Sequence, residues 1–181
     1  WANVVLDPVL ICKGQEPGAA LDTDQALQAK LLPKATFVTP NHFEAEVLSG
    51  TTINSVEDLK EAARIIHAKS GAAVLAKGGV RLEGPDAIDV FFDGETMEVL
   101  ATPKVGEVAV SGAGCSLAAA VTALLAKGHT PLQAAVEAKA CPCAPTAARG
   151  RQQLRARFPT RGWKPPRQGL EPAPAQPPAG A

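Results

Sequence analysis

Short apolar runs, separated by stretches with helical spacing, recur along the first 140 residues of the chain. The run at 3–6 is closed by Asp and Pro, which predicts a buried parallel strand. Similar runs at 36–39 and 72–76 predict two more strands of this kind. Because such strands alternate with helical stretches, the pattern predicts an α/β fold built on a mostly parallel sheet.

Helix signals occupy the intervals between these runs. Five stretches combine helical spacing with a capping residue, a first-turn proline, or a glycine or proline that ends the helix. They predict helices at 22–32, 42–50, 55–70, 115–127 and 130–140. Two further apolar runs, 88–92 and 96–100, flank Asp93-Gly94, which is a hairpin signal. The hairpin would add an antiparallel edge to the sheet.

Composition describes a globular chain with an uneven charge distribution. Hydrophobic residues make up 46% and charged residues 20%, which is typical neither of a membrane protein nor of a fully disordered polymer. Basic and acidic residues are equal at 18 each, so the net charge does not favour a nucleic-acid partner. However, residues 141–181 hold seven basic residues and one acid, which leaves 11 basic and 17 acidic residues in 1–140. The body is therefore acidic and the tail basic.

The two ends of the chain carry their own signals. The chain opens on Trp1 rather than Met, directly before a predicted strand, so we expect a fragment that lacks its N-terminal part. Residues 141–181 are rich in Pro, Arg, Ala and Gly, so we expect a disordered tail behind a folded domain at 1–140. Cys141 and Cys143 lack a second cysteine pair, which favours incidental cysteines over a metal site. Sparse cysteines and no signal-peptide pattern predict a cytoplasmic setting.

The stretch Ser111-Gly112-Ala113-Gly114-Cys115 opens an apolar predicted helix. Small residues there allow successive backbone N–H groups to face one concavity at the positive helix end, which suits a phosphate or a developing anion. A cysteine in the first turn of a helix is favoured as a thiolate, which could act as a base or orient a hydroxyl. The alternative is close helix packing with an inert cysteine. On this stretch alone the two interpretations carry equal weight.

Polar residues follow the first two predicted strands, where ligands of open α/β sheets bind. Asp7 comes after the first strand, and Asn41 and Glu44 follow the second. Asp7 with Glu44 would suffice for Mg²⁺, which takes one or two carboxylates beside phosphate oxygens and water. The alternative is that Asn41 caps a helix and the acids are solvated, and the residues by themselves favour it somewhat.

Lys77-Gly78-Gly79 follows the third predicted strand directly. A lysine and free N–H groups at this point could meet a nucleotide phosphate. The segment has neither the spacing of a P-loop nor the Ser or Thr that ends one, so it is a weak signal by itself. The three histidines have no metal-ligand spacing, and we assign no metal to them.

Five segments occur in order along the chain: Asp7-Pro8-Val9, Cys12-Lys13-Gly14, Thr39-Pro40-Asn41-His42-Phe43-Glu44-Ala45, Lys77-Gly78-Gly79 and Gly112-Ala113-Gly114-Cys115. Together they resemble the ribokinase-like superfamily, and within it the bacterial pyridoxal kinases that are similar to hydroxymethylpyrimidine and phosphomethylpyrimidine kinases. The resemblance covers Asn3 to about Ala140, which corresponds to the C-terminal, nucleotide-binding part of such kinases. It implies a three-layer α/β/α fold with a mostly parallel sheet.

The resemblance also implies an activity, namely ATP-dependent transfer of a phosphoryl group to the hydroxymethyl group of pyridoxal or pyridoxine. Cys115 would then take or orient the hydroxyl proton, in the position where most relatives use an aspartate. Gly112, Ala113 and Gly114 would supply the N–H groups of an anion hole. The residues implied to hold Mg²⁺ and phosphate-bound water are Asp7, Asn41 and Glu44, and those implied to line the ATP site are Lys77, Gly78, Gly79 and Asp89.

Three departures from the family pattern matter. The family's N-terminal part, which supplies much of the substrate pocket, is absent from this sequence. Val110-Ser111 stands where relatives often carry Asn-His, which affects local loop contacts. The last helix should continue past Ala140 with apolar residues, so we hypothesise a reading-frame change near Lys139. A family-like helical continuation in another frame of the nucleotide sequence would support this hypothesis, whereas a match of the tail to relatives would contradict it.

Other functions remain open at this point. A hydroxymethylpyrimidine or phosphomethylpyrimidine kinase of thiamine biosynthesis is the main alternative, because the discriminating pocket lies largely in the part that is absent. A non-catalytic remnant that at most binds nucleotide is a third. The resemblance implies a homodimer acting on a small molecule, with no membrane partner. A nucleic-acid contact by the tail is the least favoured, because only Phe158 and Trp163 could serve as stacking platforms there.

Overall fold

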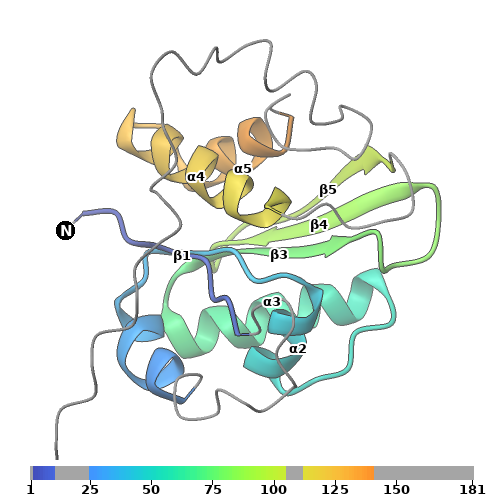
Figure 1. Cartoon of the computed structure of the whole chain (residues 1–181), viewed down its shortest axis with the longest axis horizontal. Coiled ribbons are helices and arrows are strands. Elements are labelled where there is room, and N and C mark those ends of the chain that lie inside the picture. Colours follow the sequence, from blue (N-terminus) through green and yellow to red (C-terminus); the bar gives the residue numbers. More distant parts are fainter. Residues whose placement is uncertain (1, 11–24, 105–111, 141–181) are drawn as a thin grey trace, which may run out of the picture. The chain divides into compact units, whose positions relative to one another are not determined.

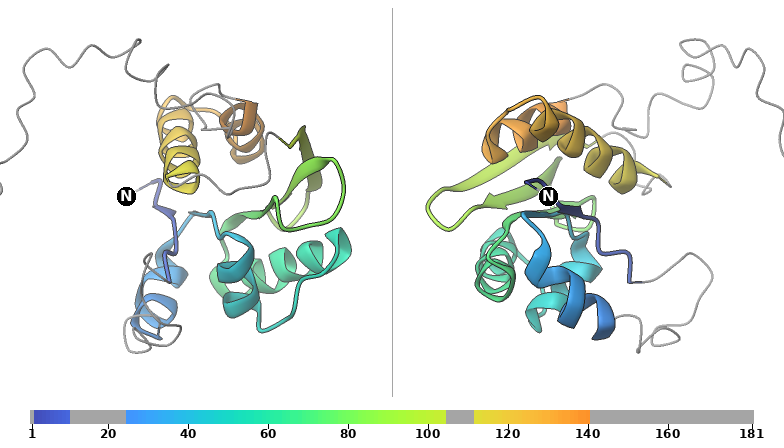
Figure 2. Two further views of the ribbon diagram at one scale, coloured as in Figure 1. Left: turned by 45° about the vertical axis from the view of Figure 1, so that its right-hand side comes forward. Right: turned by 90° about the vertical axis from the view of Figure 1, so that its left-hand side faces the viewer.

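A computed structural model describes residues 2–10, 25–104 and 112–140, all within the first of the chain's two units, Trp1–Arg149. A five-stranded sheet forms the middle layer of this unit (Figure 1). Helices α2 (His42–Ser49) and α3 (Val56–Ser70) cover one face, and α4 (Ala113–Ala126) and α5 (Pro131–Ala140) cover the other (Figures 1 and 2). The predicted three-layer α/β/α arrangement is confirmed.

The strands follow one another across the sheet in chain order. They are β1 (Val5–Leu6), β2 (Phe37–Val38), β3 (Ala73–Gly79), β4 (Asp86–Phe92) and β5 (Met97–Pro103). The pairs β1–β2 and β2–β3 are parallel, whereas β4 runs antiparallel to both β3 and β5. Four of the five strands therefore point the same way, and the prediction of a mostly parallel sheet with an antiparallel hairpin is confirmed.

The first strand differs from its prediction as a buried strand. Val5 and Leu6 are only half-buried, whereas Phe37 and Val38 of β2 are fully enclosed. The reason is position, because β1 lies at the edge of the described sheet and has a strand partner on one side only. Its pairing is extended by Thr36, whose hydroxyl oxygen accepts a hydrogen bond from the Val4 N–H at 2.8 Å.

The core consists of two apolar layers, one on each face of the sheet. The α2–α3 side is packed by one stripe of α3 against Val38, Val74 and Val90 of the sheet. The other side packs Phe37 and Phe91 against α4 and α5. Three alanines of α5, Ala134, Ala135 and Ala138, are buried in this layer. The α3 stripe consists of Leu59, Ala62, Ala63 and Ile66.

Capping signals located two helix starts correctly. Asn41 caps α2 and Ser55 caps α3, each in a reciprocal capping box. Asp58 completes the second box, in place of the usual Glu. Hydrogen bonds from the Ser55 hydroxyl, and then from the Asn54 N–H, hold the pKa of Asp58 below its ordinary value. Gly50 and Gly71 end the two helices with positive φ, as left-handed caps.

Several predicted boundaries shift: the helix predicted at 115–127 is Ala113–Ala126, and the hairpin strands predicted at 88–92 and 96–100 are Asp86–Phe92 and Met97–Pro103. Two further shifts have a clear physical reason. The expected helix at 22–32 is seen only from residue 25, and it continues as a π-helical turn, Leu27–Leu31, and a 3₁₀ turn, Leu32–Lys34. Pro33 lies inside the 3₁₀ turn instead of stopping the helix, because the first positions of a helical turn need no N–H donor. The third strand does not end at 76 but continues to Gly79, because its pairing with β4 carries it onward.

Candidate functional site

Polar side chains meet at the carboxyl ends of β1, β2 and β3. Asp7 follows β1 directly, Thr39 follows β2, and Lys77 lies late in β3. The Lys77 ammonium contacts the Asp7 Oδ1 atom at 3.2 Å, and the Thr39 hydroxyl donates to the same oxygen at 3.0 Å. The Lys77 and Asp7 side chains are 12% and 19% exposed, so the pair is largely shielded from water. Parallel strands thus bring together residues that are far apart in sequence.

The start of α2 provides a second carboxylate. The Asn41 Oδ1 atom accepts from the Glu44 N–H at 3.0 Å, and the Asn41 N–H donates to Glu44 Oε2 at 2.7 Å. The capping interpretation of Asn41 is therefore confirmed, while its role toward a phosphate or a metal stays a prediction. A single backbone bridge pairs Asn41 with Lys77, which ties this helix start to β3.

Glu44 is buried, and this changes its acidity. Burial is the main cause that raises the pKa of Glu44 from 4.5 to about 6. The Asn41 N–H and the Lys77 charge lower the pKa, whereas the Asp7 charge raises it. Two carboxylates therefore compete for one ammonium. A cation between them would relieve this repulsion.

The donor set fits a magnesium ion. Asp7 and Glu44 offer hard carboxylate oxygens, and Mg²⁺ uses one or two of these together with water and phosphate oxygens. The described part of the chain has no cluster of three or more potential metal ligands, so it holds no complete protein cage for a metal. Mg²⁺ suits such a partial site better than zinc, which prefers nitrogen and sulfur ligands.

Helix α4 places its first turn beside Lys77. Gly112 adopts a left-handed conformation with φ of +86°, and the Ser116 N–H donates to its carbonyl at 2.9 Å. A Cβ atom built on Gly114 would lie 3.0 Å from the Lys77 Nζ atom, so the end of the Lys77 side chain packs closely against this glycine and would have to shift to admit a side chain there. Cys115 follows with an exposed thiol. The Lys77 ammonium thus lies between the Asp7 carboxylate and the start of α4.

The glycines after Lys77 have a structural reason that the sequence did not show. A Cβ on Gly78 would come within 2.5 Å of the Ile88 carbonyl oxygen, which β4 brings close. Gly79 has a φ of +58° and lies where the register with β4 shifts. Both belong to β3 and do not form a separate turn, which corrects the expectation of a glycine turn after the strand.

Both carboxylate oxygens of Asp89 accept hydrogen bonds within the fold. Its Oδ1 atom accepts from the Gly79 N–H at 3.4 Å, and its Oδ2 atom accepts from the Lys139 ammonium at 2.7 Å. Lys139 also donates to the Ala87 carbonyl at 3.0 Å. Sequence reasoning missed Lys139, because no local signal links the end of α5 to a strand 50 positions earlier. Asp89 therefore braces the Gly79 segment, and its place in the ATP site stays a prediction.

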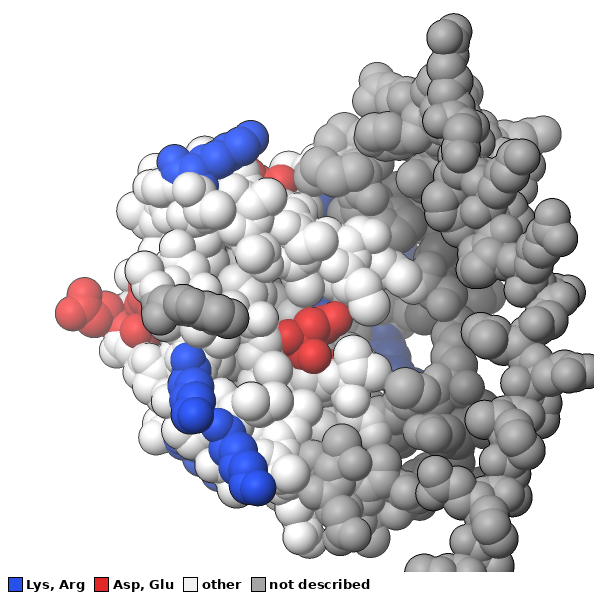
Figure 3. All heavy atoms as spheres, turned by 60° about the vertical axis from the view of Figure 1, so that its left-hand side comes forward, with Lys and Arg blue, Asp and Glu red and all other residues white. Residues whose placement is uncertain are grey.

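Some segments discussed from the sequence lie outside the described part of the chain. They are Cys12-Lys13-Gly14, Ser111 and the predicted tail, in which Cys141 and Cys143 were interpreted as incidental cysteines. In the space-filling view of Figure 3, the described residues show scattered acidic and basic side chains on a largely uncharged surface. No helix among 2–10, 25–104 and 112–140 has the length and apolar character needed to cross a bilayer.

Comparison with known proteins agrees with this geometry. The model of the phosphomethylpyrimidine kinase family matches residues 1–144, and the chain belongs to this family. The chain is 46% identical over 138 residues to the pyridoxine kinase of Bacillus subtilis, an alignment that covers 76% of this chain and 51% of that protein. It is 39% identical over 135 residues to the hydroxymethylpyrimidine/phosphomethylpyrimidine kinase of the same organism, covering 73% and 49%.

A solved structure shows the same fold. It is the pyridoxal kinase from Staphylococcus aureus in complex with AMP-PCP, with a TM-score of 0.69 and 43% identity over 76% of this chain and 50% of that chain. The chain thus spans about half the length of the relatives it matches. The predicted resemblance to pyridoxal kinases and their pyrimidine-kinase relatives is confirmed.

Proposed function

We propose that this chain is the nucleotide-binding part of an ATP-dependent kinase that phosphorylates the hydroxymethyl group of pyridoxal or pyridoxine. The observation that carries the proposal is the Lys77 ammonium, which lies between the Asp7 carboxylate and the Gly114 turn of α4. A triphosphate needs such a cation beside free N–H groups. The AMP-PCP complex of the Staphylococcus aureus pyridoxal kinase supports the nucleotide, and the B6-kinase relatives support the acceptor.

Each residue then has a defined task. Lys77 and the N–H groups at Gly112, Ala113 and Gly114 would hold and neutralise the transferring phosphoryl group. Asp7 and Glu44 would hold Mg²⁺, which when bound neutralises charge between the phosphates. Lys77, Gly78 and Gly79, braced by Asp89, would form one wall of the ATP site. Asn41 would orient Glu44 through the observed capping box.

Cys115 would serve as the base. Its thiol is exposed at the first turn of α4, where an acceptor hydroxyl can reach it. With Cys115 as the thiolate, the hydroxyl oxygen attacks the γ-phosphorus, its proton passes to the thiolate sulfur to give a thiol, and the bond from the γ-phosphorus to the β-γ bridging oxygen breaks to release ADP. Loss of a positioned base costs about 10² to 10⁴ in rate.

A thiamine-pathway substrate is the second candidate. The matching family model describes phosphomethylpyrimidine kinases, and a relative of this kind shares 39% identity. Both acceptors carry a hydroxymethyl group on an aromatic ring, so the same nucleotide site serves either. The higher identity to the pyridoxine kinase favours pyridoxal or pyridoxine as the phosphoryl acceptor.

The test is phosphorylation of pyridoxal and hydroxymethylpyrimidine, side by side, with Mg²⁺ and ATP. We expect pyridoxal to be preferred and the rate to fall at least about 100-fold in Cys115→Ala. Thr122→Ala is the matched control, because Thr122 is exposed on the same helix and its hydroxyl bonds only within α4. Preference for the pyrimidine would promote the second candidate. No turnover by a folded sample that binds Mg·ATP would identify a non-catalytic remnant.

The homodimer implied by the family resemblance has a separate test. Sedimentation at several chain concentrations, with and without Mg·ATP, would give the mass of the assembly. A mass of one chain throughout would contradict the dimer.

A further inference from the structure

The hydrogen bonds to the Asp7 carboxylate are unevenly distributed between its two oxygens. Both hydrogen bonds that described residues give to the Asp7 carboxylate fall on Oδ1, one from Lys77 and one from Thr39. The Thr39 hydroxyl is fully buried and hydrogen-bonded, so it fixes this oxygen whether or not the ammonium is present. Asp7 therefore does not depend on Lys77 for its position.

The Lys77 ammonium interacts with more than one neighbouring group. Its charge acts on Glu44 as well as on Asp7, and its ammonium lies against the Gly114 turn. The start of a helix carries a partial positive charge, which repels an ammonium. An anion between Lys77 and α4 would turn this repulsion into attraction on both sides. The lysine is thus held by Asp7 but stands where a phosphate would bind it.

Asp7 is likewise placed between two cations, the Lys77 ammonium and the proposed Mg²⁺. It is one of two carboxylates that would hold Mg²⁺, yet in this structure an ammonium occupies one of its oxygens. A divalent cation beside Asp7 would face the Lys77 charge at close range, which costs free energy in a shielded site. A phosphate that attracts Lys77 removes this cost.

We propose that Lys77 is an exchangeable counter-ion of Asp7, which passes from this carboxylate to a nucleotide phosphate as a divalent cation takes its place. This inference rests on the proposed nucleotide site. Its consequence is that metal and nucleotide each bind weakly alone and favour one another when both are present. The coupling is reciprocal, because each ligand removes the competitor of the other.

Two substitutions separate this exchange from ordinary metal–nucleotide affinity. Mg²⁺ binds AMP-PCP in free solution, so synergy in the unmodified chain is not diagnostic. Lys77→Met removes the competitor of the metal, and metal alone should then bind more tightly. Asp7→Asn removes the competitor of the phosphate, and AMP-PCP without metal should then bind more tightly. A simple loss of contacts predicts the opposite or no change in each case.

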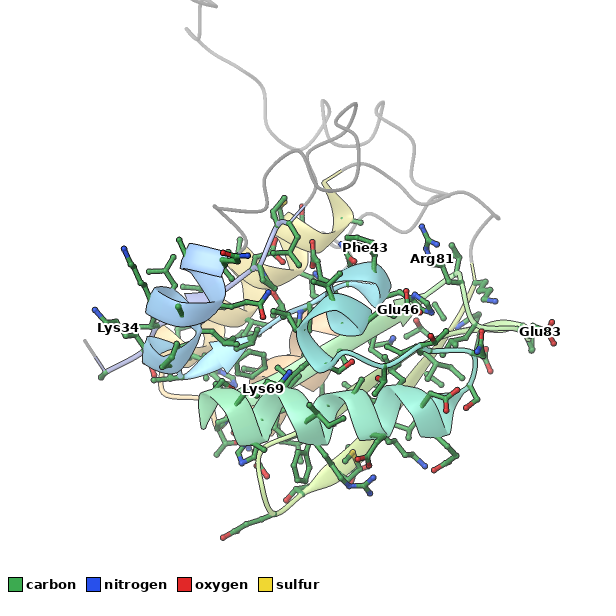
Figure 4. The ribbon with its side chains drawn as sticks, turned by 90° about the horizontal axis from the view of Figure 1, so that it is seen from below. Lys34, Phe43, Glu46, Lys69, Arg81 and Glu83 are labelled. Carbon is green, nitrogen blue, oxygen red and sulfur yellow. The ribbon has the colours of Figure 1, made fainter. Side chains whose placement is uncertain are left out.

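The metal measurement uses Mn²⁺ as the probe, with free Mn²⁺ counted by electron paramagnetic resonance. We expect Lys77→Met to bind Mn²⁺ alone about 10-fold more tightly than the unmodified chain, within the usual range of coupling. Lys34→Met is the matched control, because Lys34 is exposed and lies far to the left of Phe43, the neighbour of Glu44 in sequence (Figure 4). It should leave Mn²⁺ affinity unchanged.

The nucleotide measurement uses calorimetric titration of AMP-PCP in the presence of EDTA. We expect Asp7→Asn to bind AMP-PCP about 10-fold more tightly than the unmodified chain under these conditions. Circular dichroism checks that each variant is folded. If Lys77→Met fails to fold, Lys77→Gln replaces it in the comparison.

Three outcomes are distinguishable. Tighter binding in both variants supports the exchange, because it shows that each charged partner competes with the other's ligand. Unchanged or weaker binding in either variant, with an unmodified chain that binds Mg·AMP-PCP, overturns the exchange and leaves the proposed function intact. An unmodified chain that binds no Mg·AMP-PCP contradicts the nucleotide site, and the exchange with it.

Discussion

Two lysine–aspartate pairs join distant parts of this chain, and they differ in how each is enclosed. Lys139 and Asp89 lie 2.7 Å apart with side chains 9% and 10% exposed, and both residues have further polar partners. Lys77 and Asp7 lie 3.2 Å apart, are somewhat more exposed, and share their charges with Glu44. The first pair is a fixed brace, whereas the second is suited to exchange. Similar chemistry would thus serve structure in one place and the proposed ligand site in another.

Breaking the brace should have the largest effect on stability. Lys139→Met leaves the Asp89 carboxylate buried without its cation, which typically costs about 3 to 5 kcal/mol. The free energy of unfolding from urea titration at pH 7 measures it. Lys127→Met, at an exposed position after α4, is the control and should change little. A loss below about 1 kcal/mol would show that Asp89 finds other partners and that the pair is no brace.

Neutralising Glu44 should stabilise the chain. The pKa of Glu44 is about 6 in the folded chain against 4.5 ordinarily, so between these values the unfolded chain ionises while the folded chain keeps its proton. Stability therefore falls as pH rises from about 4.5 to 6, by about 2 kcal/mol in full. Glu44→Gln should recover this amount at pH 7 and flatten the slope, as urea titrations across pH 4 to 8 would show.

The same change should weaken the ligand site. Glu44→Gln removes one of two carboxylates proposed for Mg²⁺, so Mg·AMP-PCP affinity should fall while stability rises. Glu57→Gln is the control, because Glu57 forms only an exposed ion pair with Lys60 on α3. Equal stability and an unchanged pH slope in Glu44→Gln would contradict a buried, destabilising carboxylate.

Removing the cation of the exchangeable pair should cost less than removing that of the brace. In Lys77→Met, the Asp7 carboxylate keeps the Thr39 hydroxyl and partial contact with water, so we expect a loss of about 1 to 2 kcal/mol. Urea titration beside Lys139→Met gives a direct comparison. A loss as large as that of Lys139→Met would remove the distinction between the two pairs.

The smallest effect should come from Thr39→Val. This change keeps the shape of a fully buried side chain and removes the hydroxyl that donates to Asp7 Oδ1. A neutral donor to a charged group is worth about 1.5 to 3 kcal/mol, reduced here because Lys77 still contacts the same oxygen. We expect about 1 kcal/mol by thermal unfolding. The loss should grow when Thr39→Val is combined with Lys77→Met, since each then leaves Asp7 with fewer partners.

Local signals in the sequence determined much of this fold. Capping residues begin α2 and α3 where predicted, Thr130-Pro131 begins α5, and Asp93-Gly94 joins β4 to β5. These features depend on residues a few positions apart, so the sequence shows them directly. The Asp93 carboxylate, for example, accepts from the Thr96 N–H at 2.8 Å within its own turn. Asp7, Asn41, Glu44 and Lys77 were also singled out from the sequence, because they follow predicted strands in a family-like order, while their roles toward a ligand stay predictions.

Only the tertiary structure decided which of these residues pair. Lys77 and Asp7 are 70 positions apart, and Lys139 and Asp89 are 50 apart, so no local pattern connects them. The parallel order of β1, β2 and β3 brings the first pair together, and the packing of α5 on the sheet brings the second. Burial is likewise collective, and it raises the pKa of Glu44 although the sequence around it is that of an ordinary helix start. Sequence names the chemical groups, and packing sets their partners, their burial and their acidity.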